Sequence, residues 1–213
     1  MDLPFLYRFG ISIKNVHALL FDRGLNYVRG PQGDDAFEIM GHVYKRAVEL
    51  QCSLAEAATL EYSTSATSTT SEVTTRVYFF DRNYDVLKRK DRMISTDQVK
   101  YMQEQIRNEC SEGRISVIVV SPNKLSPQAK KEYLQAELFL FDDLLFNLPK
   151  HEYYIPHRQV TKEHVYSVLG SKLQLSDLPV LPKSDPVARW FGWPSETLVF
   201  VDNPCMPTFR IVQ

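Results

Sequence analysis

The sequence predicts an α+β protein, with a mixed α/β N-terminal domain over residues 1–142 and a small, compact C-terminal α+β domain over residues 143–213. Apolar residues recur at helical spacing in the first 50 residues, and two β-branched runs flank a helical pattern between residues 76 and 120. Eight of the twelve prolines fall in the last 70 residues, which predicts short, interrupted elements there.

The N-terminal half begins with two helical patterns. The first runs from Leu3 to Arg23 with apolar residues on one face, and Gly24 supplies its end. The second follows Asp34 and Asp35, whose acidic side chains suit a helix start. Residues 61–72 are rich in serine and threonine and have almost no large apolar side chain, so they predict a surface loop.

Alternating strand and helix patterns follow. Residues 76–80 and 115–120 are rich in β-branched or aromatic residues and predict strands. Residues 95–110 predict a helix with Thr96 as its cap, and residues 126–127 (Ser-Pro) open another short helix.

The C-terminal part predicts four short elements. A helix starts at Thr161 and reaches Leu169, and a second runs from Val187 to Phe191 after an Asp185 cap. The segments 198–201 and 208–212 alternate in polarity and predict paired strands.

Charge and hydropathy exclude several classes of protein. Lysine plus arginine is 25 and aspartate plus glutamate is 26, so the formal net charge is −1. An autonomous nucleic-acid binder is normally basic, but a chain that a larger assembly holds against DNA need not be. The longest mostly apolar stretch, Leu138–Leu148, is interrupted by Asp142 and Asp143 and is shorter than the roughly 20 residues of a membrane span. With no secretory signal pattern at the start, we expect a soluble intracellular protein without membrane contact.

The residues that carry chemistry form no recognisable active site. The three cysteines (Cys52, Cys110 and Cys205) are far apart, which indicates free thiols in a reducing compartment. The last three histidines are spaced six and seven residues apart, unlike metal ligands. No phosphate-binding glycine motif or nucleophile motif is present. We therefore predict no catalytic residue, metal or cofactor.

Two segments have the composition to meet nucleic-acid phosphate. Lys88–Lys90, with Arg82 and Arg92, is the densest basic run, but aspartates interleave with it, so a solvated charged face is an equal alternative. Residues 126–131 (SPQAKK) combine a rigid turn into a helix with two lysines, and the amides at the helix start could face a phosphate.

The strongest motif is KSDPVARWFG at residues 183–192, preceded by Leu178-Pro179. It resembles the signature L-P-x-I-x-x-x-D-P-V-A-R-Y-x-G of the fifth subunit shared by the eukaryotic nuclear DNA-directed RNA polymerases, which has a small counterpart in the archaeal enzyme. Residues 151–157 (HEYYIPH) resemble the family's H-E-L-V-P-K-H, and residues 209–212 its terminal Y-R-[LI]-V strand. In the N-terminal half, residues 6–8, 22–24 and 126–131 are similar to the family's L-W-R, D-R-G and T-P-S-A-x-K.

This resemblance implies a non-catalytic polymerase subunit in the nucleus, or in the cytoplasm or virion if the chain comes from a large DNA virus. The N-terminal domain would be a jaw near downstream DNA. The C-terminal domain would be an assembly domain that docks on the largest polymerase subunit, beside other subunits. The residues expected to contact the partner are Asp185, Pro186, Val187, Arg189, Trp190, His151, Glu152, Pro156 and His157. The residues expected near DNA are Ser126, Pro127, Ala129, Lys130 and Lys131.

Within the helix after Asp185, we expect Arg189 and Trp190 to be exposed interface residues, because exposed aromatic and arginine side chains are common interface anchors. Val187 and Phe191 fit a core role equally well. After residue 192 the family continues into a basic hairpin, whereas residues 193–207 here lack its lysines, arginines and turn glycine. The chain therefore resembles a divergent member.

Two other functions remain open. The C-terminal fold could belong to a free-standing transcription adaptor. The N-terminal domain could be a metal-dependent nuclease, with Asp81 or Asp85 and Lys88 as acid and base.

Overall fold

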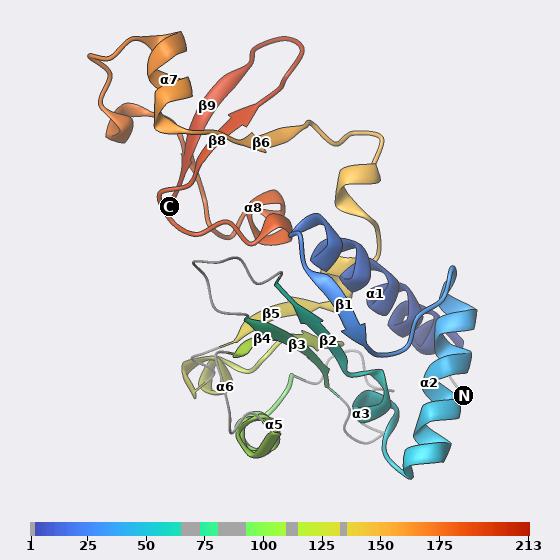
Figure 1. Ribbon diagram of the computed structural model, residues 1–213. Coiled ribbons are helices and arrows are strands. Elements are labelled where there is room, and N and C mark those ends of the chain that lie inside the picture. Colours follow the sequence, from blue (N-terminus) through green and yellow to red (C-terminus); the bar gives the residue numbers. More distant parts are fainter. Residues whose placement is uncertain (1–2, 65–72, 81–92, 110–114, 133–135) are drawn as a thin grey trace. The chain divides into compact units, whose positions relative to one another are not determined.

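In a computed structural model the chain divides into two compact units, Met1–Phe146 and Asn147–Gln213. The structure describes residues 3–64, 73–80, 93–109, 115–132 and 136–213. Both units combine helices with a sheet of mixed strand direction, which confirms the predicted α+β class (Figure 1). The roles of the two units as jaw and assembly domain stay predictions.

The N-terminal unit is built on a five-stranded sheet. Its order is β1 (Asn26–Arg29), β2 (Leu60–Ser63), β3 (Thr74–Phe79), β4 (Ile115–Ser121) and β5 (Glu137–Leu140). The pairs β1–β2 and β2–β3 are antiparallel, whereas β3–β4 and β4–β5 are parallel. The parallel half needs crossover connections, and the helices between these strands provide them.

Helices pack on both faces of this sheet. Helix α1 (Leu3–Asp22) lies on one face, where the ring of Phe9 meets that of Phe79 at 5.3 Å between centroids. Helices α5 (Thr96–Glu109) and α6 (Pro127–Glu132) cover the other face, where Tyr78 packs with Val99 and Ala129. Neighbouring residues of β3 thus serve opposite faces, as the alternation of a strand requires.

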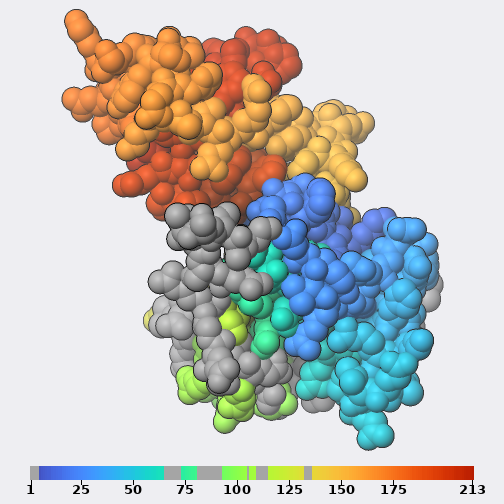
Figure 2. Space-filling model, in the orientation of Figure 1, coloured from blue at the N-terminus to red at the C-terminus, as the bar shows by residue number. Residues whose placement is uncertain are grey.

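Helix α2 (Ala36–Leu50) packs against α1 and lies along the surface of the N-terminal unit (Figure 2). The Asp35 carboxylate caps it by accepting the amide hydrogens of Phe37 (2.8 Å) and Glu38 (2.9 Å). A Cβ atom on Gly10 of α1 would lie 2.5 Å from the carbonyl oxygen of Ala36, so this crossing requires glycine. The short helix α3 (Leu54–Ala58) follows α2.

The C-terminal unit has a four-stranded sheet with a helix on each face. Its order is β6 (His157–Gln159), β8 (Leu198–Val201), β9 (Thr208–Val212) and β7 (Val180–Leu181), with β7–β9 parallel and the other pairs antiparallel. Val165 of α7 (Lys162–Leu169) packs with Leu198 and Phe209 on one face. Ala188 of α8 (Pro186–Phe191) packs with Val199 and Val212 on the other. Three short 3₁₀ helices, Phe141–Leu144, Leu148–Lys150 and Leu175–Asp177, complete the described chain.

Most elements predicted from periodicity and caps are present, but three expectations need correction. Residues 61–63 belong to β2 rather than to a loop, because Tyr62 points inward and is buried. The cap of α5 is Ser95, whose side chain accepts the amide hydrogen of Gln98 (3.4 Å), and Thr96 is the first helical residue. Helix α3 and the strands β1, β5, β6 and β7 are present although the sequence patterns did not predict them.

Some expectations lie outside the described residues, namely those for the serine- and threonine-rich residues 65–72, the basic run 88–90 and Cys110. Cys52 and Cys205 are free thiols. Of the helices that the structure describes, none is long and apolar enough to cross a membrane.

Candidate protein and nucleic-acid interfaces

The DPVAR motif forms a six-residue helix whose start and end are both capped. The Asp185 carboxylate accepts the amide hydrogen of Val187 (2.8 Å), and the Asp185 amide donates to the Pro182 carbonyl (2.8 Å). Pro186 occupies the first helical position, where no amide hydrogen is needed. Gly192 ends the helix with φ of 65°, in the left-handed region that favours glycine. The residues at the two ends of the motif are thus those that a short capped helix requires.

The side chains of α8 do not divide into exposed and buried residues as the sequence suggests. Ala188 is buried, and Val187 and Phe191 are half-buried against the same cluster. Arg189 is half-exposed. Trp190 is only 2% exposed, so the expectation of an exposed indole is wrong. The indole ring of Trp190 is therefore not an exposed side chain in this structure.

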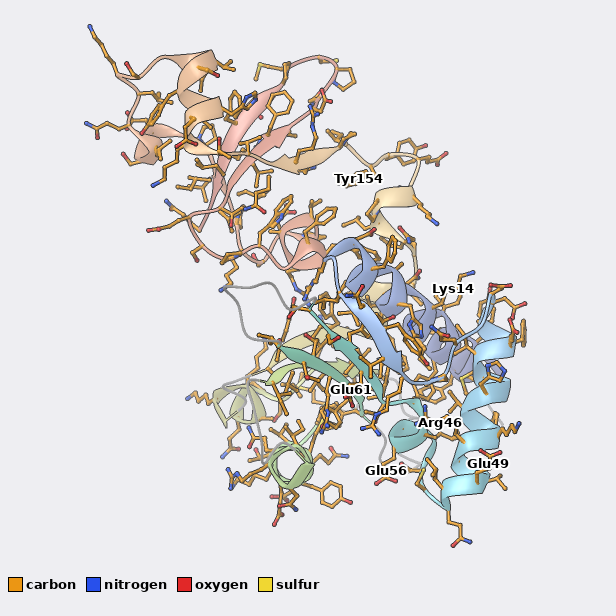
Figure 3. All side chains as sticks on the ribbon, in the orientation of Figure 1. Lys14, Arg46, Glu49, Glu56, Glu61 and Tyr154 are labelled. Atoms are coloured by element: carbon orange, nitrogen blue, oxygen red, sulfur yellow. The ribbon has the colours of Figure 1, made fainter. Side chains whose placement is uncertain are left out.

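The second candidate segment, residues 151–157, is held in shape by its own hydrogen bonds. The Tyr153 amide donates to Nδ1 of His151 (3.3 Å), and the Tyr154 amide donates to the His151 carbonyl (2.9 Å; Tyr154 is labelled in Figure 3). His157 donates from Nδ1 to the Ile155 carbonyl (2.6 Å), which fixes its ring. The segment is therefore preorganised, and ordering it on binding would cost little entropy.

Most predicted contact residues of this segment lie on the surface. His151, Glu152 and Pro156 are exposed and His157 is half-exposed. Tyr153, which was not among the predicted contact residues, is 80% exposed. The sequence did contain an indication of this role. Tyrosine stands here where the family's H-E-L-V-P-K-H pattern has leucine, and a surface tyrosine is a frequent interface residue.

Strand β8 connects the two candidate segments of the C-terminal unit. His157 pairs with Val201 of β8, and Val201 packs in the same apolar cluster as Ala188 of α8. The Asp202 amide also donates to the Pro156 carbonyl (2.8 Å). The structure thus attaches the segments 151–157 and 185–192 to one small sheet, although about 30 residues separate them in the chain.

The predicted DNA-proximal turn is a capped helix start in the N-terminal unit. Ser126 accepts the amide hydrogen of Ala129 on its hydroxyl (3.1 Å), and its own amide donates to the Ile94 carbonyl (3.0 Å). Lys130 and Lys131 are exposed, as is Pro127. Ala129 is fully buried, so it holds the turn on the sheet and cannot itself touch a nucleic acid.

Two titratable groups, the half-buried His17 and the buried Tyr62, lie away from these segments, between α1, β1 and β2. His17 donates from Nε2 to the Pro31 carbonyl (2.8 Å), so Nδ1 accepts the hydroxyl hydrogen of Tyr62. Burial lowers the pKa of His17, against the opposing effect of the Pro31 hydrogen bond. Burial, and then the neighbouring Tyr27, raise the pKa of Tyr62. These neutral groups tie three elements together.

The nuclease alternative finds no support among the described residues. Asp81, Asp85 and Lys88 lie outside them. Within the described parts of the chain, no group of three or more histidine, cysteine, aspartate or glutamate side chains could hold a metal ion.

Comparison with known proteins finds relatives among RNA polymerase subunits. No family model matches the chain. The chain is similar to the subunit RPABC1 of DNA-directed RNA polymerases I, II and III from Caenorhabditis briggsae and from Caenorhabditis elegans. Each is 30% identical over 131 residues, which cover 58% of this chain and 60% of the relative. The chain therefore spans less than two thirds of the length of the curated relatives it matches.

Proposed function

We propose that the chain is a non-catalytic subunit of a multisubunit DNA-directed RNA polymerase whose active site lies in other chains. The observation that carries this proposal is the 30% identity to a subunit shared by three polymerases. The DPVAR motif supports it, because its residues form a capped helix in a separate C-terminal unit.

In this proposal the C-terminal unit docks on the largest polymerase subunit. The docking residues are those of the preorganised segment 151–157 together with the exposed part of α8, chiefly Pro186 and Arg189. Asp185 and Val187 act by shaping α8. Tyr153 joins the proposed contact set because of its exposure.

The N-terminal unit then acts as a jaw close to downstream DNA in the nucleus. Lys130 and Lys131, presented by the Ser126 turn, supply the positive charge nearest to the phosphates. A net charge of −1 is consistent with DNA contact that depends on the assembled enzyme.

Charge reversal on the docking surface tests this assignment. We expect the double variant Glu152→Arg/Arg189→Glu to enter the polymerase at least 10-fold less than the wild-type chain when the two are co-expressed, with distinguishable tags, in their own cells. The matched control is Glu104→Arg/Lys100→Glu on α5, which makes the same exchange of charges in the N-terminal unit. Equal incorporation of both variants, measured by mass spectrometry of the purified polymerase, would remove the docking surface from the proposal.

The DNA contact is tested separately. Lys130→Glu/Lys131→Glu should leave incorporation unchanged and reduce photo-crosslinking of the assembled enzyme to downstream DNA several-fold. Crosslinking at the wild-type level would place the DNA path elsewhere. If the wild-type chain is instead recovered with a small complex that lacks the large polymerase subunits, it is a free-standing adaptor.

A further inference from the structure

Helix α2 carries an exposed apolar stripe in addition to its buried face. Its buried residues are Ala36, Ile39, Met40 and Val43. Outside that face, Phe37 is 66% exposed and Val48 is 77% exposed. Gly41 is exposed and Tyr44 is half-buried. Together with Phe37 and Val48 they recur at steps of four, three and four, which places the four residues within an arc of about 60° on the helix. The segment lies on the visible surface of the N-terminal unit (Figure 2).

Gly41 in the middle of this stripe has no packing role among the residues that the structure describes. Glycine is disfavoured in a helix interior, and a Cβ atom at Gly41 would meet no described residue within 4 Å. By contrast, Gly10 and Gly33 both sit where a Cβ atom would crowd a neighbour. The missing side chain at Gly41 leaves a notch between large apolar residues, which suits the close approach of another helix.

Two further features define the stripe. Tyr7 of α1 packs against Phe37 with ring centroids 5.6 Å apart, so the aromatic end is held in place. Glu38 and Lys45 both lie along one flank of the stripe, at about 80–100° from Phe37 around the helix axis. Within the chain, the Glu38 carboxylate accepts the Asp34 amide hydrogen (2.7 Å), and Lys45 lies 4.0 Å from the exposed Glu49 carboxylate, so pairing with a partner would add to the first contact and compete with the second. The other charged residues of α2, including Arg46 and Glu49 (Figure 3), lie still further round.

We propose that two copies of this chain associate through α2, with the two helices antiparallel about a two-fold axis. In this register Phe37 faces the partner's Val48, and Gly41 faces the partner's Tyr44. Each large side chain is thus opposite a smaller one, and the glycine notch accepts a tyrosine ring. The same contacts occur twice, as an isologous interface requires.

The flanking charges fit the same register. In an antiparallel pair about such an axis, each flank of one helix meets the equivalent flank of the other. Glu38 therefore faces the partner's Lys45, and Lys45 faces the partner's Glu38. Opposite charges meet at both ends of the stripe, whereas a parallel arrangement would bring neither pair together.

The interface is small, so the association is weak. The stripe from Phe37 to Val48 is about 16 Å long, given a rise of 1.5 Å per residue. An interface of this size falls in the weak and transient class. We expect a monomer at about 1 µM and a substantial dimer fraction at about 100 µM. The association concerns the free chain and does not depend on the proposed polymerase role.

Sedimentation velocity of the purified full chain from 1 to 300 µM tests the pairing. Gly41→Gln should weaken dimerisation at least 10-fold, because the new side chain fills the notch, and should raise the Tm of the monomer, because glutamine is the better helix former. The matched control is Val168→Gln on α7, where a valine 57% exposed lies outside the stripe; its dimerisation should be unchanged.

A charge exchange tests the register itself. Lys45→Glu and Glu38→Lys should each weaken the dimer about 3- to 10-fold, and the double variant should restore it to within about 2-fold of wild type. A wild-type chain that stays monomeric at 300 µM overturns the proposal. So does a Gly41→Gln chain that dimerises as well as wild type. A double variant as weak as the single variants excludes the antiparallel register.

Discussion

Polar contacts of two ranges stabilise this protein, and its two units provide examples of each. In the N-terminal unit, Asn15 of α1 donates from Nδ2 to the Leu144 carbonyl (2.8 Å) across 129 residues of chain. Arg23 binds both carboxylate oxygens of Glu137 (2.8 Å each) across 114 residues. In the C-terminal unit, by contrast, Asp185 and Thr161 cap their own helices over two and three residues.

A helix cap is specified by a few neighbouring residues, whereas a hydrogen bond between distant elements forms only when the whole unit is folded. A cap acts within one turn, so its loss should be felt in one helix. A buried polar bond between distant elements depends on the whole sheet, so its loss should be felt throughout the unit. Variants at Asn15, Asp185 and His17 test this contrast.

Asn15→Ala should cost the N-terminal unit about 1–3 kcal/mol in free energy of unfolding, because the buried Leu144 carbonyl would lose its donor. Amide hydrogen exchange can report this loss separately for each unit. Ser12→Ala is the matched control: its hydroxyl is also buried but donates within α1, to the Arg8 carbonyl (2.8 Å). We expect its cost to be under about 0.5 kcal/mol, since the helix retains its backbone bonds. Equal costs for the two variants would refute the distinction by range.

Asp185→Ala should cost about 1 kcal/mol, the usual value of a helix cap. Exchange should accelerate at the amides of α8 and its immediate neighbours, with β6 and α7 unchanged. Asp185→Asn keeps an acceptor oxygen and should retain most of the stability. Acceleration throughout the C-terminal unit would show that this cap acts over the whole sheet.

His17 should make the N-terminal unit sensitive to mild acid. Its pKa is lowered in the folded state, so the unfolded chain binds the proton more tightly. The stability from neutral His17 is complete above the ordinary value of 6.5 and is lost as the pH falls toward the lowered pKa. One proton sets a limit of about 1.4 kcal/mol per pH unit on the slope.

The free energy of unfolding, measured from about pH 7.5 to 5.5 (a range around the ordinary histidine value), should fall more steeply in wild type than in His17→Gln. Glutamine can still donate to the Pro31 carbonyl but does not titrate. Tyr62 stays neutral in this range, since the ordinary tyrosine pKa already lies well above it and burial raises the pKa of Tyr62 further. Parallel curves for the two proteins would mean that the His17–Tyr62 contact tolerates a proton.

The same contrast explains how much of the fold the sequence predicts. Helices α2, α7 and α8 follow from Asp35, Thr161 and Asp185, because a cap and its periodic face are contiguous in the chain. The strands β1, β5, β6 and β7 are missed, since they have two to four residues and become strands only through their neighbours. Loop-like residues 61–63 are a strand for the same reason, with Tyr62 buried between His17 and Tyr27.

The candidate site divides in the same way. The shape of α8 is predictable from Asp185, Pro186 and Gly192, but the exposure of its side chains is not. Trp190 has the composition of an interface anchor, yet the chain encloses its ring. Tyr153 replaces the leucine of the family's pattern, and in the folded chain it is 80% exposed. Burial depends on distant residues, which a single segment does not contain.

Membership of a polymerase can be tested by purifying the tagged chain from its own cells at moderate salt. If the chain is a polymerase subunit, the two largest subunits of a DNA-directed RNA polymerase are recovered in amounts comparable to the tagged chain. Recovery of the chain without these subunits, from cells in which the polymerase itself is intact, would contradict membership of a polymerase.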